Sequence, residues 1–130
     1  MAKKAAKPAA KKPVSFNDHL QWTEPATQQV LLEIQKRITA LGQKVEEKVT
    51  EQRRIAYWID DRIFAEVKVY KKLILVRFVD LSVPDPKKIV EHISYAKKHN
   101  WKLGNEIRVN SIQLVDYAMP FIEASYRDSR

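Results

Sequence analysis

The spacing of hydrophobic residues changes along the chain and first predicts a helix. Between Thr23 and Leu41 the apolar residues recur at the spacing of one helix face: Val30, Leu31, Ile34, Ile38 and Leu41. We predict a helix that begins near Thr23 or Pro25, ends at Leu41 and is stopped by Gly42. A short helical piece around residues 45–49 would follow. Residues 14–24 are expected to form an irregular lead-in that docks Phe16, Leu20 and Trp22 on the domain.

The pattern then becomes typical of strands. Residues 55–59, 63–69 and 73–79 are rich in β-branched and aromatic side chains. Two polar segments separate them, Asp60-Asp61-Arg62 and Tyr70-Lys71-Lys72. This arrangement predicts a three-stranded antiparallel meander. Neither turn contains glycine, so the sequence leaves the turn types and the register open.

The C-terminal part returns mainly to helical spacing. Asp85 as N-cap and Pro86 at the first position predict a helix that reaches about Lys98 and buries Ile89, Val90 and Ile93. A loop (99–105) and a short strand (106–109) would follow. Ser111 is expected to cap a last helix, in which Pro120 causes a kink or a split; its inward residues would be Ile112, Val115, Ala118, Met119 and Ile122. The fold class predicted is α+β: two layers, an antiparallel sheet of about four strands, and three main helices mainly on one side.

Charge is concentrated at the N-terminus. The chain of 130 residues fits one domain and carries a net charge of +8. The first thirteen residues contain no acid and five lysines: Lys3, Lys4, Lys7, Lys11 and Lys12. Subtracting those five leaves +3 for the rest. This Lys/Ala/Pro segment has nothing to bury, so we predict a disordered tail (1–13) and a single domain (14–130).

Several classes of function are disfavoured by composition. The chain has no cysteine, which excludes disulfides and cysteine-ligated metal sites and suits the reducing cytoplasm, where we expect the protein. No apolar run approaches the ~18 residues of a membrane span, and the basic start lacks the apolar stretch of a secretory signal. The three histidines (His19, His92 and His99) lack metal-ligand spacing, and no glycine-rich phosphate loop is present. We therefore expect no cofactor, no metal and no membrane partner.

Nucleic acid is the leading partner, either DNA or RNA, bound without catalysis. Each tail lysine can neutralise one phosphate, although the tail could also serve only for solubility. A second basic surface is expected near the sheet edge, formed by Arg53, Arg54, Lys68, Lys71, Lys72 and Arg77.

Strand alternation adds a candidate binding platform. It points Ile55, Tyr57, Ile59, Ile63, Ala65, Val67 and Val69 to the core. The other face would then carry Trp58, Phe64, Glu66, Lys68, Leu73, Leu75 and Arg77. Aromatic and basic residues on an open sheet can stack the bases of single strands. Alternatively a helix or the lead-in covers this face, and Trp58 and Phe64 belong to the core.

Two other functions are kept as alternatives. A small-molecule or protein-interaction module would use a pocket lined by Tyr57, Trp58, Phe64 and Trp101. A magnesium-dependent nuclease would use Asp60, Asp61, Glu66 and Lys68, because carboxylates hold the metal and the lysine supports the attacking water. A two-residue turn at Lys71 and Lys72 would instead set Glu66 opposite Arg77, so that a cross-strand ion pair explains both residues.

Several spaced features over about residues 16–127 resemble a bacterial family, the domain of unknown function 5655. They are Ile55-Ala56-Tyr57, Phe64-Ala65-Glu66-Val67, residues 72–75, Trp101, residues 106–109 and Ala124-Ser125-Tyr126, with Asp18-His19-Leu20 as the lead-in. The resemblance implies a compact α+β domain, sometimes joined to nuclease-like or restriction-associated domains, without an activity to carry over. The family's glycine-rich loop is reduced here to Leu103-Gly104-Asn105, and the lysine tail is not part of its pattern.

Overall fold

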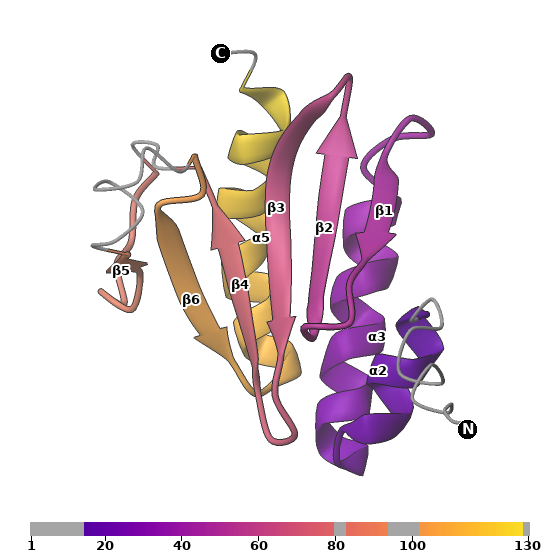
Figure 1. Ribbon diagram of the computed structural model, residues 1–130. Coiled ribbons are helices and arrows are strands. Elements are labelled where there is room, and N and C mark those ends of the chain that lie inside the picture. Colours follow the sequence, from indigo (N-terminus) through magenta and orange to yellow (C-terminus); the bar gives the residue numbers. More distant parts are fainter. Residues whose placement is uncertain (1–14, 80–82, 94–101, 129–130) are drawn as a thin grey trace.

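A computed structural model describes residues 15–79, 83–93 and 102–128, and shows an antiparallel sheet with helices packed on one face (Figure 1). Its strands are β1 (Glu46–Val49), β2 (Arg54–Ile59), β3 (Arg62–Val69), β4 (Ile74–Phe78), β5 (Glu91–His92) and β6 (Asn105–Val109). Its helices are α2 (Phe16–Trp22), α3 (Pro25–Thr39) and α5 (Ile112–Arg127). The described part thus confirms the α+β class with three helices, but its sheet has six strands rather than about four, in the order β1-β2-β3-β4-β6-β5.

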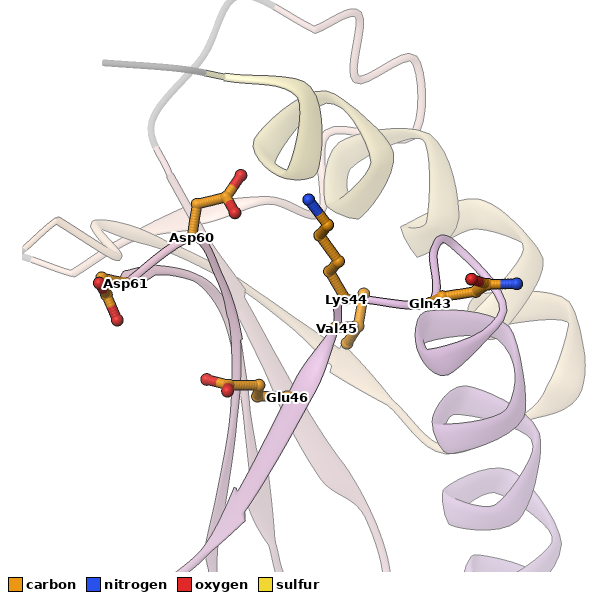
Figure 2. Close-up of a pocket in the computed structure, with 6 residues that line it drawn as sticks. All are labelled: Gln43, Lys44, Val45, Glu46, Asp60 and Asp61. Atoms are coloured by element: carbon orange, nitrogen blue, oxygen red, sulfur yellow. The ribbon is translucent and has the colours of Figure 1, made fainter.

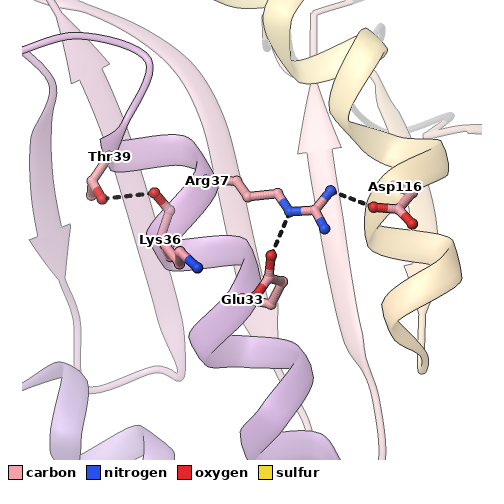
Figure 3. A network of polar contacts seen from close by, with 5 residues as sticks. All are labelled: Glu33, Lys36, Arg37, Thr39 and Asp116. Carbon is pink, nitrogen blue, oxygen red and sulfur yellow. Dashed lines mark hydrogen bonds and ion pairs between the residues drawn. The ribbon is translucent and has the colours of Figure 1, made fainter.

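The core lies between the sheet and helices α3 and α5. The apolar stripe of α3 is buried as its spacing predicts, and Val115, Ala118 and Ile122 of α5 are fully enclosed. A polar contact joins the two helices at the surface (Figure 3), where Arg37 of α3 bonds both Glu33 of its own helix and Asp116 of α5. None of the described helices covers the opposite face of the sheet, which we call the open face (Figure 1).

The central meander forms as expected, with a β-bulge that the alternation did not reveal. Asp60 and Asp61 both have positive φ (49° and 63°), the conformation of a two-residue type I′ turn. Tyr57 pairs with Ala65 but Trp58 pairs with Ile63, so Phe64 is the extra residue. The bulge turns Phe64 into the core, against the ring of Tyr126 at 5.2 Å between centroids. The alternation was therefore wrong for Phe64 and Ile63, which exchange faces.

The N-terminal elements differ from the prediction in three ways. Residues 16–22 form a helix, because Ser15 and Asp18 cap it by bonding each other's backbone N–H. Phe16, Leu20 and Trp22 pack against the core as expected. Residues 46–49 form a strand, since pairing with β2 outweighs weak helical spacing. Helix α3 ends at Thr39 rather than Leu41.

Gly42 was predicted to stop this helix, but it does not adopt the left-handed conformation in which glycine commonly does so, because its φ is not positive. Its missing side chain matters instead for packing. A Cβ atom at this position would lie 2.3 Å from the hydroxyl oxygen of Tyr126.

The helix predicted from Pro86 is absent where the structure describes it. Asp85 does accept bonds from the backbone of Ile89 and Val90, but it caps a turn. Lys88 has φ 55°, and residues 91–92 pair with β6, so the chain cannot continue as a helix there. Residues 94–98 of the predicted helix lie outside the described ranges, as does the tail (1–13).

The last helix has the predicted start, with the Ser111 hydroxyl accepting a bond from the Leu114 N–H. It runs through Pro120 as one helix, so the predicted split does not occur. Ile112 was placed inward by its spacing but is 40% exposed, because it lies in the first turn.

Candidate functional site

The open face of the sheet is ordered in rows by the strand register. One row crosses four strands: Arg54 pairs with Lys68, Lys68 with Leu75, and Leu75 with Arg108. We call these four residues the basic row. Paired residues point to the same face, so the register brings three cations and one leucine together on the face opposite the helices.

In the row next to the basic row, the charge of Arg77 is neutralised by carboxylates of the same row. Arg77 bonds Glu66 on β3 at 3.0 Å and Glu106 on β6 at 3.1 Å, and its side chain is only 7% exposed. The expected pairing of Glu66 with Arg77 is confirmed. Arg77 therefore lies on the predicted face, but its guanidinium is held by carboxylates.

The cations of the basic row, by contrast, have no carboxylate within 4.0 Å among the described residues. The Nε atom of Arg54 is buried and has no hydrogen-bond partner there. Like charges placed directly opposite each other destabilise a sheet. Arg54 and Lys68 therefore form an arrangement that folding alone does not favour and that an anion would relieve.

A hollow of about 320 Å³ adjoins the basic row at the β3–β4 hairpin. It is lined by Tyr70, Lys72, Leu73, Leu75 and Arg108. Tyr70 is 41% exposed, which is high for an aromatic side chain, and the Lys68 ammonium lies 5.7 Å from the centre of its ring. The hollow thus combines an aromatic ring and apolar floor with cations at its edge.

Two further cations contact the ring of Trp22, on α2, at the same end of the sheet. The guanidinium carbon of Arg53 lies 4.0 Å from its ring centre and the Lys71 ammonium lies 5.5 Å away. The backbone N–H of Glu24 donates to the Lys71 carbonyl at 3.0 Å, which fixes the hairpin against the start of α3.

His19 of α2 contacts Arg53 and the backbone at Thr50. Its Nε2 lies 2.6 Å from the Thr50 carbonyl, and its Nδ1 lies 3.0 Å from Nη1 of Arg53. Because arginine only donates and a carbonyl only accepts, the ring must be neutral with its proton on Nε2. Burial, aided by the charge of Arg53, lowers the pKa of His19, whereas the bond to Thr50 and the charge of Asp18 oppose this.

The structure brings five of the predicted basic residues to one end of the sheet and adds Arg108. We call this set the basic end: Arg53, Arg54, Lys68, Lys71, Lys72 and Arg108. Asp18 interacts electrostatically with Arg53, but none of the six residues forms an ion pair with a carboxylate among the described residues.

The opposite end of the sheet is acidic. A hollow of about 520 Å³ lies there, and its lining includes Glu46, Asp60 and Asp61 together with Lys44 (Figure 2). The linings of the two hollows therefore differ in charge: Lys72 and Arg108 line the one at the β3–β4 hairpin, whereas three carboxylates and one lysine line the other.

The residues predicted to line one pocket do not come together. Tyr57 and Phe64 are fully buried in the core, whereas Trp58 lies on the open face under the ammonium of Lys48, 4.4 Å from its ring centre. Tyr57 donates a hydrogen bond to Glu47 at 2.8 Å, and burial raises the pKa of its phenol. Trp101 lies outside the described residues.

The nuclease residues are also separated. Asp60 and Asp61 form the β2–β3 turn, while Glu66 is bonded to Arg77 further along the sheet. Within residues 15–79, 83–93 and 102–128, no group of three or more acidic or histidine side chains could hold a metal ion.

Sequence reasoning did not identify Trp22, Tyr70 and Arg108 as site residues. Arg108 alternates with buried Ile107 and Val109, which indicates an outward position, but only the pairing of β6 with β4 places it beside Leu75. Tyr70 lies in the predicted turn. An aromatic residue in a turn is expected to be exposed, and this could have indicated a binding residue.

No family model matches this chain, and no curated protein and no solved structure matches it either. None of the helices that the structure describes is both long enough and apolar enough to cross a membrane.

Proposed function

We propose that this protein binds nucleic acid through the basic end of its sheet, with the lysine-rich N-terminal segment adding electrostatic attraction. The observation that carries the proposal is the absence of carboxylate partners around the basic row within the described structure. The arginines that pair with carboxylates in the described structure are Arg37, Arg77 and Arg127, and none of them belongs to the basic row.

The geometry of the basic end suits a phosphodiester backbone. The basic row spans β2, β3, β4 and β6, and neighbouring antiparallel strands lie about 4.8 Å apart, so its cations extend over roughly 14 Å. A polymer with one charge per nucleotide can contact several of them at once. Binding of this kind releases counterions and weakens steeply with salt.

The test compares charge reversals at the two ends of the sheet in the full-length protein. Binding of a fluorescein-labelled 20-nucleotide strand is followed by anisotropy at several KCl concentrations. Lys68→Glu is expected to weaken binding and to reduce the salt dependence. Lys44→Glu changes the net charge equally at the acidic end and is expected to have little effect.

A third variant separates the tail from the domain. Replacing Lys3, Lys4, Lys7, Lys11 and Lys12 with alanine should weaken binding without abolishing the difference between the Lys68 and Lys44 variants. If both reversals weaken binding equally, or if the alanine variant no longer binds, the basic end is not the binding surface.

A further inference from the structure

The hollow beside the basic row has a composition that phosphate binding alone does not require. Cations alone are sufficient to bind a phosphate. The lining of this hollow also includes the Tyr70 ring and the side chains of Leu73 and Leu75. Tyr70 is one of three large apolar side chains that the described structure leaves exposed, and the other two, Leu32 and Ile112, are on the helices. Leu75 is 7% exposed and provides a floor to the hollow.

From this composition we infer that the hollow takes an unstacked nucleobase, so that the partner is a single strand of nucleic acid. The inference rests on the proposed function and narrows its partner. A base offers a flat apolar surface that can stack on an aromatic ring, and its own phosphate carries the negative charge that the adjacent cations attract.

The positions of the charges fit one nucleotide and its neighbours. Lys72 and Arg108 line the hollow itself, and the Lys68 ammonium lies 5.7 Å from the ring of Tyr70. Arg54 continues the row away from the hollow, beside Lys68. A strand whose base lies on Tyr70 would therefore lead its flanking phosphates along the basic row.

A double helix is a poorer occupant of this hollow. Its bases are stacked on each other and present only their edges in the grooves. The cations of the basic row lie on strands, whose open face presents a surface rather than a protruding helix. A duplex would contact the cations through phosphates but leave the Tyr70 hollow unfilled.

The experiment uses two fluorescein-labelled strands with equal numbers of phosphates, a 12-nucleotide oligothymidylate and an abasic strand of the same length. The full-length protein is expected to bind the oligothymidylate at least about fivefold more tightly, since stacking on one aromatic ring contributes at least that factor. Tyr70→Ala should remove this preference, because it lowers the affinity for the oligothymidylate more than the affinity for the abasic strand. Tyr70→Phe, which keeps the ring, should retain the preference.

Leu32→Ala is the matched control, because Leu32 is equally exposed at 41% but lies on α3, away from the hollow. Equal affinity of the wild-type protein for both strands would overturn the inference. So would a Tyr70→Ala variant that keeps the preference, or one that loses affinity for both strands alike while still folded.

The outcomes separate this inference from the proposed function. Salt-sensitive binding that depends on Lys68 but shows no preference for bases would leave the proposed function intact and refute the single-strand inference. A 12-base-pair duplex bound as tightly as the oligothymidylate would also refute the inference. Absence of binding to any strand at low salt would refute both.

Discussion

Arg54 and Lys68 stand directly opposite each other on the adjacent antiparallel strands β2 and β3. The pair has no carboxylate neighbour within 4.0 Å in the described structure. One row away, Glu66 and Arg77 face each other on β3 and β4 as an ion pair. The same sheet therefore contains one charge pair that stabilises it and one that opposes folding.

Reversing the charge of Lys68 should stabilise the fold. Lys68→Glu places a carboxylate opposite Arg54 and is expected to raise the free energy of unfolding by roughly 0.2–1 kcal/mol. Urea denaturation measures this change. In an Arg54→Ala background the gain should disappear, as a double-mutant cycle would show. A variant that is destabilised in both backgrounds would indicate that Lys68 contributes packing rather than repulsion.

Removing Arg77 should destabilise the protein strongly. Arg77→Met leaves Glu66 and Glu106 with little exposure and without their cation, which is expected to cost about 3–5 kcal/mol. Adding Glu66→Gln and Glu106→Gln should recover part of this loss. Arg127→Met is the control, because its pair with Glu123 is exposed and should contribute no more than about 1 kcal/mol. Similar losses for Arg77→Met and Arg127→Met would contradict the role of burial.

Stability should fall below about pH 6.5 because of His19. The pKa of this histidine is lowered in the folded state, mainly by burial, so the unfolded chain binds its proton at higher pH. The stability that neutral His19 contributes is therefore complete above about pH 6.5 and is lost as the pH falls toward the folded pKa.

Urea unfolding between pH 8 and pH 5 measures this dependence. His19→Gln should flatten it, and His92→Gln, which removes a histidine at an exposed site on β5, is the matched control. An unchanged pH profile in the His19 variant would mean that another group titrates.

Removing the Tyr126 hydroxyl should restore the stability that is lost when Gly42 is replaced by alanine. Gly42→Ala places a Cβ atom 2.3 Å from the Tyr126 hydroxyl, whose ring is packed against Phe64, and is expected to cost about 1–3 kcal/mol. Tyr126→Phe removes that oxygen and should restore most of the stability, since the ring carbon lies at an ordinary 3.4 Å. Thermal unfolding of the two single variants and the double variant tests this. Equal losses with and without the hydroxyl would point to the backbone instead.

The sequence was most informative where local spacing and burial agree. The α3 stripe, the three-stranded meander and the Ser111 cap all follow from contacts within one element or between adjacent ones. The prediction from the sequence was wrong at residues 46–49 and 91–92. Short strands form there only because a neighbouring strand supplies their backbone hydrogen bonds. The prediction was also wrong at Phe64, because a bulge changes the face of a residue without changing its chemistry.

The candidate site shows the same division. The sequence by itself determined the number of cations in the turn and strand segments and the concentration of lysines at the N-terminus. The tertiary structure decided which of these cations pair with carboxylates and which remain available to bind an anion. Arg77 lies between two carboxylates, while Arg54, Lys68 and Arg108 form a row without any in the described structure. The reason is that strand pairing brings together cations that lie 14 to 54 positions apart along the chain, and local spacing does not show that β6 pairs with β4.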